Sequence, residues 1–244
     1  MTFMAVERVQ LICLPYAGAG AAVYRGWQAL LPHWIDLIAP ELPGRGLRQA
    51  EPALQDWSKL IEIVMASVRP RLRAPLALFG HSMGALVAIE LAHALRASGA
   101  PAPLWVGASG CVAPQRRKLD LSWRDCPDET LVAELRSLGG TPPEVLESRD
   151  LLDLVLPTVR ADFHLCGSYR PTRRPPLDCP LLVLGGVRDP ISQPHDNLSA
   201  WSQETNGPCR IELIDGGHFF IHENEASVVD LVISSLVKLE PALV

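Results

Sequence analysis

The segment at residues 80–84, Gly-His-Ser-Met-Gly, constrains the fold of this chain more than any other. It follows the apolar run 75–79 and precedes a helical pattern, and G-x-S-x-G between a strand and a helix is typical of a nucleophile elbow. A Cβ at Gly80 or Gly84 would collide with so sharp a turn, which explains the two small residues. The turn is expected to raise the Ser82 hydroxyl above the sheet and to place the next backbone N–H at a helix N-terminus.

The elbow motif is short, and an ordinary glycine-serine turn at a strand end has the same letters, so its context matters. Apolar runs typical of strands occur at residues 9–14, 35–39, 76–79, 104–108, 181–184 and 210–214. Helical patterns are found around residues 24–31, 57–71 and 85–98. This alternation predicts an α/β fold, with a mostly parallel central sheet flanked by helices on both faces. The nearly continuous apolar strands also suit a sheet that is covered on both sides.

Residues 113–176 break this alternation because they contain no convincing strand. One helical pattern has leucines at 131, 135 and 138, a second runs from 151 to 159, and turn residues at 139–143 separate them. A helical insert between two strands of a parallel sheet lies above the carboxyl ends of the strands, where ligands bind. We interpret residues 113–176 as a helical lid inserted into a single domain that spans residues 1–244. A helical edge subdomain with no gating role is the alternative.

The composition limits the class of protein. A chain of 244 residues, 48% hydrophobic and 20% charged, suits one large globular domain. Its net charge of −5 gives no general attraction to nucleic acid. The N-terminus lacks the basic and apolar regions of a signal peptide, and no apolar run is long enough to span a membrane. We therefore expect a soluble, cytoplasmic protein with no nucleic-acid or membrane partner.

The cysteines give no sign of a disulfide framework or a metal site. None of them forms a C-x-x-C pair, and several lie in apolar runs; the six are Cys13, Cys111, Cys126, Cys166, Cys179 and Cys209. This pattern predicts reduced, mostly buried thiols and no bound metal.

A serine nucleophile needs a histidine base and an acid that orients it, and in this fold the chain order is serine, acid, histidine. His218 follows the apolar strand in Gly-Gly-His-Phe, where two glycines allow a sharp turn that brings the imidazole over the sheet end. His222, four residues later, is the alternative base. Three other histidines fit less well, namely His93 in the elbow helix, His164 in the lid and His195 at a predicted helix start.

The best candidate for the acid is Asp189, which lies in the loop that follows the strand at 181–184. An aspartate before a proline is also common in ordinary turns. Asp215 is a competitor, but it lies only three residues before His218. Asp162 and Asp178 fit less well. Because Ser82, Asp189 and His218 occur in the required order, each at a strand end, the chain is predicted to be a serine hydrolase.

The oxyanion of such a reaction needs two backbone donors. One is the N–H of Met83, and the other is expected from the loop after the first strand, where the backbone N–H of Ala17 is the best candidate. The glycines at 18 and 20 also suggest a phosphate loop, but the segment lacks Gly-Lys-Ser/Thr and a full G-x-G-x-x-G, so we set that reading aside.

Several motifs occur together along nearly the whole chain, from residue 9 to the last helix. They are LPYAG at 14–18, PELPGRG at 40–46, GHSMGA at 80–85, LGGTP at 138–142, LPTVRAD at 156–162 and GGHF at 216–219. This combination resembles the stand-alone (type II) thioesterases of nonribosomal peptide and polyketide synthesis, which are α/β-hydrolases with a helical lid. The elbow is shared by all such hydrolases, whereas the two lid motifs at 138–142 and 156–162 are much more specific. Two residues depart from the family pattern: Ala19 replaces a usual second glycine, and Arg188 stands where the family often has another acid.

The resemblance implies hydrolysis of acyl or aminoacyl groups from the phosphopantetheine arm of a carrier protein, with Ser82, His218 and Asp189 as the triad. It implies no cofactor beyond the arm that the substrate carries, and a monomeric enzyme. An acidic carrier protein would need local positive charge. Candidates are Arg116, Arg117 and Lys118 at the start of the lid and Arg170, Arg173 and Arg174 at its end, although each also suits a solvated basic face. Trp123, Phe163 and Tyr169 either line an acyl channel or pack the small core of the lid.

Three other functions use the same features. A small-molecule esterase or lipase needs only the triad, and a non-catalytic binding protein needs only the fold. A chain-terminating or cyclising thioesterase shares the triad, but a chain that begins at its own Met1 without a leading carrier domain favours the stand-alone form.

Overall fold

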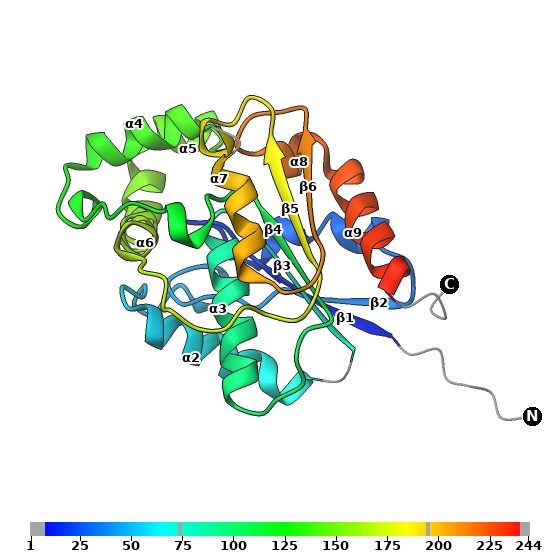
Figure 1. Cartoon of the computed structure of the whole chain (residues 1–244). Helices are drawn as coiled ribbons and strands as arrows, with labels where there is room; N and C mark the ends of the chain where they lie inside the picture. Colours follow the sequence, from blue (N-terminus) through cyan, green and yellow to red (C-terminus); the bar gives the residue numbers. More distant parts are fainter. Residues whose placement is uncertain (1–7, 73–74, 194–195, 240–244) are drawn as a thin grey trace, which may run out of the picture.

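The computed structural model describes residues 8–72, 75–193 and 196–239. Its centre is a six-stranded sheet in the order β2-β1-β3-β4-β5-β6, in which every neighbouring pair is parallel (Figure 1). The strands are β1 (Val9–Leu14), β2 (Ile35–Ile38), β3 (Leu76–His81), β4 (Trp105–Ser109), β5 (Leu181–Gly186) and β6 (Cys209–Ile214). The predicted α/β fold is confirmed, and each strand lies within two residues of its expected bounds.

Helices cover both faces of the sheet, and each inner strand sends alternate side chains into two separate cores. Ile12, Leu78 and Val183 face the side of α2 (Trp57–Val68) and α3 (Met83–Ala97). Leu11, Phe79 and Leu182 face the side of α1 (Trp27–Leu30) and α9 (Glu225–Leu239). Two single-turn helices, α7 (Asp196–Ser199) and α8 (Phe220–Glu223), lie in the last third of the chain. The sheet is therefore buried on both sides, as its apolar strands require.

Two predicted helices are shorter than expected. Two short elements replace the helix predicted at 24–31, namely the 3₁₀ turn Ala21–Tyr24 and the single-turn helix α1. Helix α1 ends at Leu30 because the next residue, Leu31, precedes Pro32, and a residue before proline disfavours helical backbone. Helix α2 ends at Val68 and continues only as a 3₁₀ turn, Arg69–Arg71, since Pro70 has no N–H to donate.

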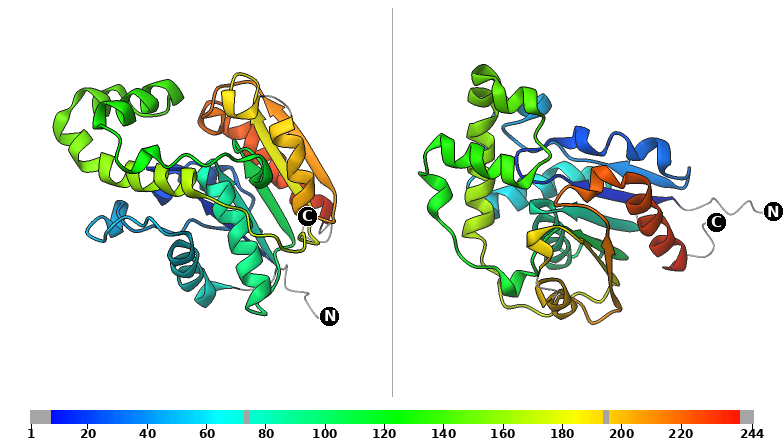
Figure 2. Two further views of the ribbon diagram at one scale, coloured as in Figure 1. Left: turned by 60° about the vertical axis from the view of Figure 1, so that its left-hand side comes forward. Right: turned by 90° about the horizontal axis from the view of Figure 1, so that it is seen from above.

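The insert between β4 and β5 contains three helices: α4 (Asp128–Leu138), α5 (Pro143–Glu147) and α6 (Arg149–Ser168). They form a small hydrophobic cluster of their own, made by Leu131, Val132, Leu135, Leu156 and Val159. Figure 2 shows this group of helices projecting beside the body of the molecule. The helical character of the insert is as expected from its sequence, while its role as a lid stays a prediction.

The cysteines are all free, but they are less buried than predicted. Cys13 and Cys111 are buried, and the other four are half-buried. Burial raises the pKa of Cys166 to about 12 and that of Cys179 to about 11, so these thiols stay protonated near neutral pH. Among the described residues, no helix combines the length and the apolar character needed to cross a bilayer.

Candidate active site

Ser82 stands in a strained turn between β3 and α3. Its φ of 53° makes it the only non-glycine residue with positive φ in the described part of the chain. Its N–H donates to the carbonyl of Ser109 at 2.7 Å, which ties the turn to the end of β4. A Cβ at Gly84 would press against the carbonyl oxygen of Leu14, and one at Gly80 against that of Gly84. The expected need for glycine on both sides of the serine is confirmed.

A buried histidine–carboxylate pair lies at the ends of the last two strands. His218 Nδ1 is 3.0 Å from Asp189 Oδ2, and the side chains are 3% and 0% exposed. Asp189 also accepts hydrogen bonds from the backbone N–H of Ile191 at 3.0 Å and from Ser192 Oγ at 3.2 Å. Because the carboxylate can only accept, it favours the tautomer with the proton on Nδ1 and leaves Nε2 of His218 free to act as a base.

Close backbone packing brings this pair beside the elbow. A Cβ at Gly186 would lie 2.5 Å from the carbonyl oxygen of Gly217 and 3.0 Å from Asp189 Cβ, so only glycine lets the two loops meet. The ring of His218 lies 5.2 Å from that of His81, the residue before Ser82. Within the described residues the Ser82 hydroxyl has no side-chain partner, and catalytic hydrogen bonds are often long until substrate binds.

Two backbone N–H groups are available near Ser82. Met83 is the first residue of α3, and the first amides of a helix have no intrahelical acceptor. Ala17 lies in the turn after β1, where its N–H meets no acceptor among the described residues, while Gly18 N–H donates to Asp162 and Ala19 N–H to Tyr16. The contact of Gly84 with Leu14 places the N-terminus of α3 directly against the end of β1. Both expected donors therefore come from neighbouring segments.

The alternative acids and bases are engaged elsewhere. His222 Nε2 lies 3.0 Å from the Tyr16 hydroxyl, and His222 belongs to the single-turn helix α8. Asp215 pairs with Arg188 at the surface, so the unusual arginine does not contact the carboxylate of Asp189. The remaining candidates also lie apart: His93 accepts from Arg96, Asp178 accepts from Asn206, His164 lies in α6, and His195 falls outside the described residues.

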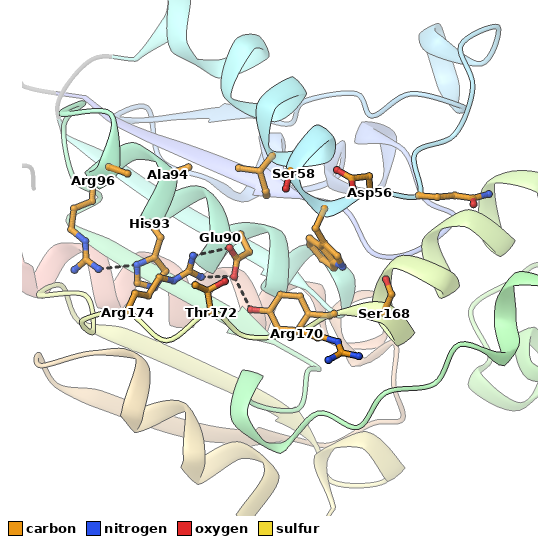
Figure 3. Close-up of a pocket in the computed structure, with 15 residues that line it drawn as sticks. Asp56, Ser58, Glu90, His93, Ala94, Arg96, Ser168, Arg170, Thr172 and Arg174 are labelled. Carbon is orange, nitrogen blue, oxygen red and sulfur yellow. Dashed lines mark hydrogen bonds and ion pairs between the residues drawn. The ribbon is translucent and has the colours of Figure 1, made fainter.

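The three predicted channel residues separate into two groups. Trp123 and Phe163 lie edge to face, 5.1 Å apart, and pack against the helices of the insert. Tyr169 instead packs in the main core, 5.0 Å from Trp57, and its hydroxyl donates to Glu90 at 2.7 Å. It borders a cavity of about 700 Å³ between α2, the second half of α3 and the segment 168–174 (Figure 3).

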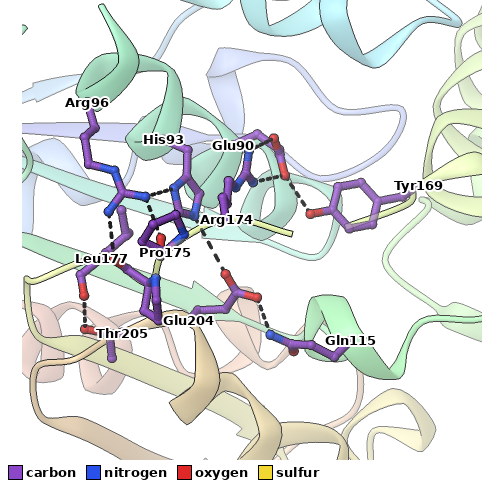
Figure 4. Close-up of polar contacts among 11 residues, drawn as sticks. Glu90, His93, Arg96, Gln115, Tyr169, Arg174, Pro175, Leu177, Glu204 and Thr205 are labelled. Atoms are coloured by element: carbon purple, nitrogen blue, oxygen red, sulfur yellow. Dashed lines mark hydrogen bonds and ion pairs between the residues drawn. The ribbon is translucent and has the colours of Figure 1, made fainter. Parts of the chain in front are cut away.

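Two of the predicted basic contacts are used inside the molecule. Arg174 pairs with Glu90, and in a separate group of polar contacts Arg96 donates to the carbonyl of Pro175 (Figure 4). Arg117 is half-buried and donates to the carbonyl of Cys166 at 2.8 Å. The other four basic candidates are exposed and form no ion pair within the described ranges: Arg116, Lys118, Arg170 and Arg173.

Residues 9–236 match the family described as the thioesterase domain. The chain belongs to the thioesterase family. The gramicidin S biosynthesis protein GrsT of Aneurinibacillus migulanus is 35% identical to it, over 94% of this chain and 89% of that protein. The chain is thus related to enzymes that hydrolyse thioesters. Its resemblance to type II thioesterases is confirmed by the solved structure of the type II thioesterase BorB from the borrelidin biosynthetic cluster, which superposes with a TM-score of 0.85 at 36% identity, covering 93% of this chain and 92% of BorB.

Two further solved structures show the same fold. The thioesterase RedJ from the prodiginine biosynthetic pathway of Streptomyces coelicolor superposes with a TM-score of 0.86 at 36% identity, covering 95% of this chain and 90% of RedJ. ClbQ from the colibactin NRPS/PKS pathway superposes with a TM-score of 0.90 at 30% identity, covering 96% and 98%.

Sequence reasoning missed two residues beside the site of this thioesterase. Arg45 and Asp162 form a buried ion pair next to Gly18, with the side chains 7% and 1% exposed. The sequence suggests Asp162 only as a less suitable acid for the triad, and it suggests no individual role for Arg45. Both belong to motifs that carry the resemblance, at 40–46 and 156–162, and this was the one available signal.

We expect the stability of the folded protein to depend on pH because the imidazole of His81 is buried. Burial, and then the nearby His218 and His222, hold its pKa well below the ordinary value of 6.5. As the pH falls below 6.5 the unfolded chain takes up a proton that folded His81 does not, so the free energy of unfolding decreases. Urea titrations between pH 6.5 and 5 measure this effect. The free energy of unfolding of the wild type should decrease by up to about 1.4 kcal/mol per pH unit more than that of His81→Asn. Equal slopes for the two proteins would contradict a neutral His81.

Proposed function

We propose that the protein hydrolyses acyl or aminoacyl groups from the phosphopantetheine arm of carrier proteins, using Ser82, His218 and Asp189 as a catalytic triad. The observation that carries the proposal is the buried hydrogen bond between His218 and Asp189 at the sheet edge where strained Ser82 lies. A base oriented by a carboxylate, beside a half-buried serine and unpaired amides, is the set of groups that acyl transfer requires.

In the first half of the reaction, His218 Nε2 takes the proton of the Ser82 hydroxyl as Oγ attacks the thioester carbonyl carbon. The C=O electrons move onto oxygen, and the N–H groups of Ala17 and Met83 stabilise the resulting oxyanion. The tetrahedral intermediate collapses and the C–S bond breaks. The arm leaves as a thiol that takes the proton from His218, and a thiolate needs less acid assistance than an amine.

In the second half, a water molecule enters and gives a proton to His218 Nε2 as its oxygen attacks the acyl-Ser82 ester. The same two amides stabilise the second oxyanion. When the ester C–O bond breaks, His218 returns the proton to Ser82 Oγ and the free acid leaves. Asp189 keeps its negative charge throughout and stabilises the imidazolium that forms in each half.

The carrier-bound substrate is supported by the relatives. GrsT is a gramicidin S biosynthesis protein, and RedJ and ClbQ come from the prodiginine and colibactin pathways. Exposed Arg116, Lys118 and Arg173 offer positive charge for an acidic carrier protein despite the net charge of −5. We further propose a monomer in the cytoplasm, where free thiols such as Cys166 persist.

The two histidines near the site give a test of the base. His218→Ala should lower kcat on an acyl thioester by about a thousandfold or more, because proton transfer and the orienting carboxylate are lost together. His222→Ala is the matched control and should keep at least about a tenth of the activity, since it removes only the contact with the Tyr16 hydroxyl. Steady-state kinetics give kcat for both variants. A larger loss of kcat in His222→Ala than in His218→Ala would assign the base to His222.

The substrate class can be tested by comparing an acyl group on a carrier protein with the same group on N-acetylcysteamine and as an aryl ester. We expect the highest kcat/KM for the carrier-bound acyl group, and we expect added salt to reduce this advantage because charged surfaces meet. Replacing Arg116 and Lys118 by glutamate should lower kcat/KM only for the carrier substrate. Equal kcat/KM values for all three substrates would favour a small-molecule esterase, and no turnover of any substrate would favour a non-catalytic protein.

A further inference from the structure

The loop that carries Ala17 is held from outside the sheet by a helix of the insert. Gly18 N–H donates to Asp162 Oδ2 at 2.7 Å, and Asp162 lies on α6, 144 residues further along the chain. The Asp162 side chain is 1% exposed. A buried carboxylate that accepts a backbone N–H fixes the direction of that peptide group, because few other partners are available in the interior.

Arg45 completes this contact and reaches the other side of the loop. Its guanidinium donates to both carboxylate oxygens of Asp162, at 2.5 and 2.9 Å. It also donates to the carbonyl of Ala19 at 3.2 Å and to that of Pro43 at 3.3 Å. The ion pair therefore binds an N–H and a C=O of the same short loop, one on each side of the peptide that follows Gly18.

Packing keeps α6 against the loop. Thr158 Oγ1 donates to the carbonyl of Gly44 at 2.6 Å, which fixes the helix to the segment that presents Arg45. Gly18 has a φ of 76°, and a Cβ there would lie 2.9 Å from Val159 Cγ2. The helix thus sits so close to the loop that it leaves no room for a side chain at residue 18.

The residue before Ala17 is held as well. The Tyr16 ring packs edge to face on the ring of Phe219, with 4.9 Å between the centroids. Ala17 stands between these anchored neighbours, and its own N–H is left without an acceptor in the described part of the chain. This is the arrangement expected of a donor kept oriented for a ligand oxygen.

We propose that Asp162, together with Arg45, is a positioning residue for the oxyanion donor. The pair orients Gly18, and through it the Ala17 N–H, so that the donor is in place before negative charge develops. The proposal rests on the role of Ala17 in the proposed function. It also links the insert to catalysis, because α6 carries both Asp162 and the apolar side chains Leu156 and Val159 of the insert's own core.

General energetics favour this role over one in stability alone. A buried ion pair seldom stabilises a fold more than apolar residues of the same size, because removing two charges from water costs about as much as their attraction returns. An oxyanion donor, in contrast, is sensitive to small displacements. Replacing the pair by apolar side chains should therefore separate catalysis from stability.

The test uses the double variant Arg45→Met/Asp162→Leu, which removes both charges and leaves neither unpaired. On an acyl-N-acetylcysteamine thioester we expect kcat to fall about 100-fold, the range seen when one oxyanion donor is lost, with KM within about threefold. Asp162→Asn keeps a carbonyl oxygen for Gly18 but loses the ionic contact with Arg45, and should reduce kcat about tenfold. Thermal unfolding of both variants is measured alongside.

The matched control is Asp128→Leu/Arg160→Met. Arg160 also lies on α6 and pairs with Asp128 at 2.5 Å, but it faces α4 and the carbonyl of Cys126 instead of the loop. We expect its kcat to stay within about threefold of the wild type. If the double variant does not fold, the comparison of kcat between Asp162→Asn and the control still tests the proposal.

Three results would overturn the proposal: wild-type kcat in the folded Asp162 variants, a loss confined to KM, or a loss of kcat in the control as large as in the Asp162 variants. The small thioester separates this question from the proposed function. An inactive wild type would contradict the proposed triad chemistry itself. An active wild type whose kcat is matched by the Asp162 variants would contradict only the positioning role.

Discussion

The N-terminus of α3 and the end of β1 approach so closely that no side chain fits between them. At Gly84 a single added carbon would meet the carbonyl oxygen of Leu14. This approach forces the chain through a tight turn at Ser82, which accepts a positive φ that serine rarely adopts. It also sets the first amide of α3 beside the loop that contains Ala17. The proposed nucleophile and both proposed oxyanion donors therefore lie beside one backbone contact.

The parallel sheet supplies the rest of the site. Because neighbouring strands run in the same direction, the loops after β3, β5 and β6 gather at one edge, although Ser82, Asp189 and His218 are far apart in sequence. Gly186 at the end of β5 then lets the loop after β5 meet the loop after β6, so that Asp189 and His218 come within hydrogen-bond distance. Helix α6 of the insert packs against the loop of Ala17, and the buried ion pair between Arg45 and Asp162 joins the helix to this loop.

The predictable features were those that depend on local sequence. The strands, the elbow and the loops that carry Asp189 and His218 follow from apolar runs, glycines and chain order, all of which can be read without a structure. Tyr169 was harder, because the end of α6 turns it away from the insert toward Glu90. The pairing of Arg45 with Asp162 was beyond reach, since it depends on which face α6 presents to a loop more than a hundred residues earlier. Contacts between elements distant in sequence depend on packing, and a single sequence does not reveal packing.

In the proposed reaction, Ser82 attacks a carbonyl whose oxygen accepts hydrogen bonds from the amides of Ala17 and Met83. A crystal structure with an alkyl boronic acid tests it most directly, because the boronate formed on a serine mimics the tetrahedral intermediate. We expect boron bonded to Ser82 Oγ, with one boronate oxygen about 2.7–3.1 Å from both backbone nitrogens and another near His218 Nε2. A boronate on Ser82 whose oxygens contact neither amide, or no adduct at Ser82, would contradict the account.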